Sequence, residues 1–220
     1  MTRPKLLLAA LAWRSLQTAP ACILLLGAPS GLARDLTVQA VAGAPVLLDG
    51  RCDEPAWDRA MPSQLSEDRS MLALDHGAAL TLCWRFPVQT LGLDLYIQDA
   101  QGALHDLHIS AQTGERTRTA EGWPEWTAFG QHQGWYAPPY AFSGFKADAS
   151  GARRIVFAAQ PSRELQFFKA RFGPGPWRIM VEAQSMVPEA EIVRYPAKSS
   201  PDDPATWGWL RVGVVAAAPP

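Results

Sequence analysis

The sequence lacks the features that mark several common enzyme classes and nucleic-acid-binding proteins. It has no GxSxG or HExxH motif and no glycine-rich phosphate loop. Its 20 basic residues nearly balance its 21 acidic residues without forming a basic stripe, so nucleic acid is not an expected partner. No long helical periodicity is present. Since 48% of the residues are hydrophobic and 19% are charged, the chain is expected to form one globular domain.

The first 33 residues have the pattern of a secretory signal. Arg3 and Lys5 precede two apolar runs, and Gly31-Leu32-Ala33 offers the small residues that a signal peptidase requires. A single membrane anchor is the alternative, although neither run reaches the roughly 18–20 residues of a spanning helix. We expect residues 1–33 to be a cleaved signal peptide. The mature chain, with a net charge near −4, would then be secreted or periplasmic.

Cleavage would leave two cysteines, Cys52 and Cys83. In an oxidising compartment a lone pair of cysteines often forms a disulfide. Two buried free thiols are the alternative, because free cysteines are common in protein cores.

Short apolar runs separated by Gly, Pro and Asp predict a β-sandwich, because they recur every 8–12 residues or so. Strands are expected at 36–41, 45–48, 79–86, 92–98, 104–111, 154–159, 165–172, 177–185 and 209–215. Segments 98–102 and 172–176 are predicted hairpin connections. One short helix is expected at 54–60, and residues 216–220 are expected to be a flexible tail.

The sharpest motif is LLDGRCDEPAW, residues 47–57. Asp49-Gly50 is typical of a turn, because glycine tolerates a positive φ. The acidic pair Asp53-Glu54 suits the first turn of a helix, where negative charge is favoured. Trp57 would then plug a core from that short helix.

This arrangement resembles the start of the family 9 carbohydrate-binding modules, which open with an apolar strand, Asp-Gly, an acidic pair and a Trp. Later segments are similar to strands of that family in the same order: 93–102, 104–115, 176–188 and 205–215. The resemblance implies an antiparallel, jelly-roll-like, all-β sandwich over residues 34–215 that binds sugar without catalysis. In the family, two Trp side chains sandwich a sugar ring and calcium often supports the fold. Neither Trp position is occupied by Trp here; Trp84 lies some residues upstream of the first.

The segment 121–142 interrupts the regular strand spacing and is rich in aromatic residues. A sugar site requires exposed aromatic planes beside hydrogen-bonding groups. The segment supplies the aromatic residues Trp123, Trp126, Phe129, Trp135, Tyr136, Tyr140 and Phe142, together with Glu121, Glu125, Gln131 and Gln133. We predict that the ligand-binding residues are Trp123, Trp126, Trp135, Tyr136, Trp84 and Glu125. The alternative is that these aromatics form a small satellite core that holds the loop down.

Metal and haem sites have weaker candidates. His105 and His108, three residues apart on a strand, would face opposite sides, so a zinc site is not expected. Calcium could use carboxylates, and the candidates are Asp99, Asp202 and Asp203. Some related, DOMON-like sandwiches bind haem; the ligand candidates would be Met180, Met186 and Lys169, but the sequence has no CxxCH motif.

A glycosidase would need two carboxylates that face one cleft. Glu125, Glu164 and Glu182 are candidates, and their spacing singles out no pair. We therefore expect a secreted, non-catalytic protein that binds an oligo- or polysaccharide, as an accessory to polysaccharide breakdown. A haem-binding electron-transfer domain of similar fold and a glycosidase-associated domain acting on O-glycosyl compounds are the alternatives.

Overall fold

The computed structural model describes residues 37–38, 41–42, 46–86, 90–128, 134–138, 142–157, 162–185 and 191–212. The expected signal peptide and C-terminal tail lie outside these residues, and both stay predictions. Within the described part of the chain, no helix has the length and apolar character needed to span a membrane.

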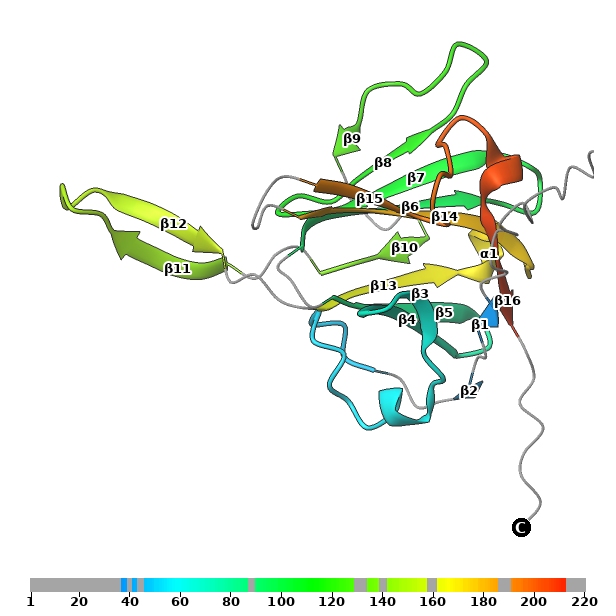
Figure 1. The fold of residues 1–220 in the computed structure, drawn as a ribbon, viewed down its shortest axis with the longest axis horizontal. Helices are drawn as coiled ribbons and strands as arrows, with labels where there is room; N and C mark the ends of the chain where they lie inside the picture. Colours follow the sequence, from blue (N-terminus) through cyan, green and yellow to red (C-terminus); the bar gives the residue numbers. More distant parts are fainter. Residues whose placement is uncertain are drawn as a thin grey trace, which may run out of the picture. The chain divides into compact units, whose positions relative to one another are not determined.

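Two β-sheets stack face to face, which confirms the predicted all-β sandwich (Figure 1). The first is an eight-stranded sheet, in the order β1 (Thr37–Val38), β16 (Gly208–Val212), β14 (Trp177–Ser185), β6 (Thr90–Gln98), β7 (Leu104–Ile109), β8 (Gly114–Thr117), β9 (Thr127–Ala128), with β15 (Glu191–Tyr195) also paired to β14. The second is a six-stranded sheet, in the order β10 (Trp135–Tyr136), β13 (Ser162–Phe168), β5 (Ala79–Arg85), β4 (Arg69–Asp75), β2 (Val41–Ala42), with β3 (Ser63–Ser66) on β4. All strand pairs are antiparallel except β1 with β16 and β2 with β4.

The main core fills the space between the two sheets. Strand β6 shows how the sequence builds it, because Leu93, Leu95 and Ile97 alternate with Asp94 and Tyr96. Alternate residues of a strand point to opposite faces, so the three apolar side chains enter the core and the other two point away from it. The aromatic members of this core are Trp84, Phe86, Trp135, Phe167, Phe172, Trp177 and Tyr195.

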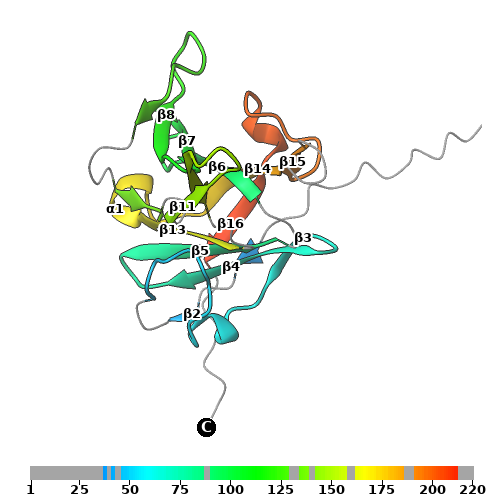
Figure 2. The same ribbon diagram turned by 90° about the vertical axis from the view of Figure 1, so that its left-hand side faces the viewer.

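The opening segment covers the far side of the six-stranded sheet (Figure 2). Trp57 is buried against Leu72 and Leu74 of β4, as its position in the sequence motif predicted. The helix is shorter than expected: a single 3₁₀ turn, η1 (Trp57–Arg59), in place of residues 54–60.

Glu164 of β13 anchors this opening segment. Its carboxylate accepts hydrogen bonds from the backbone N–H of Asp49 (3.0 Å), the N–H of Gly50 (2.8 Å) and the Nε1–H of Trp57 (3.1 Å). The turn is thus fixed by a residue more than 100 positions later in the chain. Burial raises the pKa of Glu164 to about 7, and repulsion from Glu54 adds to the effect of burial.

A disulfide between Cys52 and Cys83 also ties the opening segment to the sheet, with the two Cα atoms 6.1 Å apart. The sequence left open whether these two cysteines are bonded or are buried free thiols, and the structure has the disulfide. Cys83 lies in β5, so the bond crosses from the covering segment to a central strand.

Several strand predictions need correction. The described residues 46–48 form no strand, and the strands β3, β4, β8 and β15 were not predicted. Segment 98–102 does join a hairpin, β6 to β7, but segment 172–176 does not. Strands β13 and β14 belong to different sheets and are joined through a single helical turn, α1 (Lys169–Phe172). A separate two-stranded sheet is formed by β11 (Phe142–Ala147) and β12 (Arg153–Phe157).

Candidate functional site

The side of the eight-stranded sheet that faces away from the main core carries aligned polar side chains. We call it the outer face. Because the strands are in register, its residues form two rows. One row is Met180, Tyr96, Asp106 and Arg116; the other is Arg194, Glu182, Asp94, His108 and Gly114.

Trp126 is the exposed aromatic residue of the outer face, with 39% of its surface open to solvent. Its ring centroid lies 4.2 Å from the guanidinium carbon of Arg116 and 5.0 Å from the ring centroid of His108. The indole also packs over Gly114, where an added Cβ atom would be in ordinary contact with Cε3 of Trp126 at 3.5 Å. The sheet therefore holds this ring in place while leaving part of it uncovered.

Trp123 has a different role. It packs edge-on against Tyr96, with ring centroids 5.5 Å apart, and joins a small cluster with Leu104, Met180 and Trp207. This cluster is the satellite core that we considered as the alternative for the loop aromatics. Trp123 thus anchors the loop to the sheet by packing, while the ring of Trp126 stays exposed to solvent.

Two of the predicted ligand-binding residues have no ring surface exposed to solvent. Trp84 and Trp135 are buried in the main core, so neither ring can stack on a ligand. Aromatic side chains bury large apolar areas, and these two fill the space between the sheets. Tyr136 is exposed but lies on β10 of the six-stranded sheet, and Glu125 is exposed next to Trp126. The remaining loop residues Phe129, Gln131, Gln133 and Tyr140 lie outside the described residues.

His108 is hydrogen-bonded through both ring nitrogens. Its Nε2 lies 2.8 Å from Oγ of Ser110, which also contacts the carbonyl of Gln112 at 2.9 Å. On the other side, His108 Nδ1 lies 2.5 Å from a carboxylate oxygen of Asp94. Both ring nitrogens are therefore engaged within the chain, and the hydrogen bond to Asp94 raises the pKa of His108.

Asp106 lies beneath this surface and is fully buried. Its Oδ2 accepts from Nε of Arg116 at 2.9 Å, while its Oδ1 has no hydrogen-bond partner among the described residues. Burial raises the pKa of Asp106 to about 8, and repulsion from Asp94 acts in the same direction. A buried, half-satisfied carboxyl group costs stability, and such costs tend to occur at functional sites.

Gly92 is a buried position on the outer side of β6, between Gln184 and His108. A Cβ atom added there would be 3.6 Å from Oε1 of Gln184 and 3.7 Å from Cε1 of His108. The nearby amide of Gln184 is exposed, and the hydroxyl of Ser110 is half-exposed. This part of the outer face thus combines the exposed ring of Trp126 with the exposed amide of Gln184.

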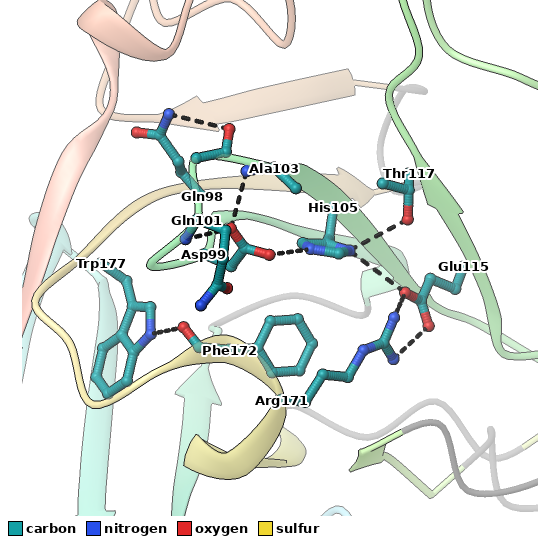
Figure 3. Close-up of polar contacts among 11 residues, drawn as sticks. Gln98, Asp99, Gln101, Ala103, His105, Glu115, Thr117, Arg171, Phe172 and Trp177 are labelled. Carbon is teal, nitrogen blue, oxygen red and sulfur yellow. Dashed lines mark hydrogen bonds and ion pairs between the residues drawn. The ribbon is translucent and has the colours of Figure 1, made fainter.

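A second polar network lies on the other side of β7 (Figure 3). His105 Nε2 is 2.9 Å from Asp99 Oδ2, and its Nδ1 is 3.2 Å from Thr117 Oγ1 and 3.6 Å from a Glu115 oxygen. Glu115 also accepts from two nitrogens of Arg171 and from Nε1 of Trp135.

This second network is structural. It ties the β6–β7 turn, β8 and α1 to one another, and its central imidazole is only 8% exposed. Burial acts to raise the pKa of Glu115. Hydrogen bonds from His105, Arg171 and Trp135 outweigh that effect and lower the pKa to about 2. Since the polar groups of Glu115 are used up by partners within the chain, it has little left to offer a ligand.

The metal and haem candidates are spread over the fold. His105 and His108 face opposite sides of β7, as strand geometry predicted. Asp99 accepts from the N–H groups of Gln101 and Ala103, Asp202 pairs with Arg118, and Asp203 caps the 3₁₀ turn η2 (Pro204–Thr206).

Lys169 was expected to lie on the strand neighbouring Met180, and this was wrong. It pairs with Asp75 on the six-stranded sheet, whereas Met180 is buried on the outer side of the other sheet. Met186 lies outside the described residues. Carboxylates close enough to share a cation occur in the opening segment, at Asp49, Asp53 and Glu54.

The three glutamates considered for glycoside hydrolysis do not meet. Glu164 is buried under the opening segment, Glu182 pairs with Arg194 on the outer face, and Glu125 lies on the loop. A glycosidase needs two carboxyl groups on either side of one bond. These three side chains therefore do not form such a pair.

Comparison with known proteins adds little. No model of a protein family matches the chain, and neither does any curated protein. One solved structure that is similar is a candidate carbohydrate-binding protein from Bacteroides uniformis. It is 9% identical, with 80% of this chain and 97% of that chain covered and a TM-score of 0.46. A similarity this low says nothing of what this chain binds, and the resemblance to the family 9 modules stays a prediction.

Proposed function

We propose that this domain binds a saccharide, without catalysis, on the open part of the outer face around Trp126 and Gly92. The exposed, immobilised ring of Trp126 carries this proposal. Sugar rings pack their C–H faces on aromatic planes while their hydroxyl groups need polar partners. The exposed amide of Gln184 can supply such a partner within the same surface.

The proposed setting is outside the cytoplasm. The N-terminal pattern favours export, and a disulfide suits an oxidising compartment. There the domain would hold a polysaccharide or its fragments for other proteins to process.

Calorimetric titration with a panel of neutral and acidic oligosaccharides tests the proposal. Trp126→Ala should weaken binding by about 2 kcal/mol, roughly thirtyfold, as expected for an aromatic residue at the centre of a contact. Phe168→Ala is the matched control, because Phe168 is similarly exposed (41%) but lies on β13 of the other sheet. Unchanged affinity in Trp126→Ala, or no heat with any saccharide, would contradict the proposal.

A further inference from the structure

The outward positions of the eight-stranded sheet carry more positive than negative charge. Strand alternation and register identify these positions. The cationic residues are Arg116, Arg178, Arg194, Arg211 and His108; the acidic residues are Asp94, Asp106 and Glu182. On a chain with a net charge of −1, this distribution is asymmetric.

The ion pairs of the outer face are also arranged asymmetrically, with the base outside and the acid beneath. Arg194 is 41% exposed against 15% for Glu182, and His108 is 29% exposed against 17% for Asp94. Arg116 is 22% exposed above Asp106, which is fully buried. A ligand that approaches this surface therefore meets the cationic partner of each pair first.

Arg194 keeps free donors. Only its Nε is used in the described contacts, donating to Glu182 at 2.7 Å. Its two terminal nitrogens have no hydrogen-bond partner among the described residues. A planar guanidinium with unused terminal donors suits a carboxylate, which can accept two parallel hydrogen bonds.

From this geometry we infer that the saccharide bound here is acidic, a uronic-acid oligosaccharide whose carboxylate pairs with Arg194 while a pyranose ring packs on Trp126. The inference rests on the proposed function. Arg194 and His108 belong to one register row across β15, β14, β6 and β7, so three strand spacings of about 4.8 Å place them roughly 14 Å apart. That distance suits a short oligosaccharide lying across the strands, over the exposed amide of Gln184.

The other charged groups near the face limit the size of the effect. His108 has no ring nitrogen left for a ligand, because both already contact Asp94 and Ser110. Glu121 and Glu125 are exposed on the loop that carries Trp126 and oppose an anion. The preference for acidic ligands should therefore be moderate and should weaken as salt is added.

The test compares each acid with its own neutral form. Trigalacturonate and trimannuronate, their methyl esters, and neutral trisaccharides are titrated at pH 6 and constant ionic strength. At least one acid should bind about three- to tenfold more tightly than its ester, and Arg194→Gln should remove that difference. Arg59→Gln removes the same charge from an exposed site on η1 and should leave the difference intact.

Two results would overturn the inference. If esters or neutral sugars bind as tightly as the acids, and Trp126→Ala still abolishes binding, the acidic preference is wrong and the proposed function stands. If no acid, ester or neutral saccharide binds, the proposed function fails as well.

Discussion

The glycine at position 92 of β6 predicts a variant that gains stability while it loses binding. In Gly92→Ala the added methyl group would make ordinary van der Waals contacts of 3.6–3.9 Å with Gln184 and His108, so the strand should accept it. Glycine inside a strand costs about 0.5–1 kcal/mol relative to alanine. Unfolding by urea should therefore show a gain of that size, and the Tm should rise by about 1–4 °C.

Binding should move in the opposite direction. The methyl group would lie between Gln184 and His108, directly beneath the surface where we place the sugar, and should hinder the sugar's contact with the Gln184 amide at a cost of about 1 kcal/mol, or roughly fivefold in affinity. Gly102→Ala is the control with the reverse pattern. Gly102 has a φ of +89° and open space around it, so alanine should destabilise the β6–β7 turn by about 1 kcal/mol without touching the site. A stable Gly92→Ala protein with full affinity would refute the placement of the site.

Three further predictions concern the fold. The two cysteines of the disulfide are 31 positions apart in the sequence. Replacing both Cys52 and Cys83 by Ala should therefore lower the free energy of unfolding by about 3–4 kcal/mol. An unchanged urea midpoint would contradict this prediction. Glu115→Gln leaves Arg171 and Trp135 without their carboxylate and should cost about 2–4 kcal/mol, whereas Glu121→Gln, at an exposed carboxylate, should cost nothing measurable. The pKa values of Glu164, Asp106 and His108 are all raised by folding, so each group stabilises the fold most at low pH. For the two carboxyl groups this contribution is lost as pH rises from about 4 through about 7 for Glu164 and about 8 for Asp106, and His108 acts in the same direction. The Tm should accordingly be higher at pH 5.5 than at pH 8.5, and the reverse order would show that these three groups do not dominate.

The strands with strong apolar patterns could be predicted from the sequence. The segments of β5, β6 and β14 were identified almost to their ends, because their inward residues are large and regularly spaced. Strands β4 and β8 were missed because Ser, Arg and Glu interrupt their patterns. The α1 turn was predicted as strand, since its four residues follow β13 without a helix signal.

The site was only partly predictable. The aromatic loop drew attention to Trp126, but loop composition could not tell it from Trp135, whose burial depends on packing between the sheets. Gly92, Arg194 and Gln184 were not identified, because their proximity depends on the register of β6, β14 and β15. Once strand pairing is known, alternation alone places them on one face.

The most direct test of saccharide binding on the outer face is an NMR titration that follows the indole N–H signals of the tryptophans. Trp126 should shift progressively as an oligosaccharide is added, while the signals of buried Trp57, Trp84 and Trp177 stay in place. A saccharide that binds and leaves the Trp126 signal unmoved would contradict the account.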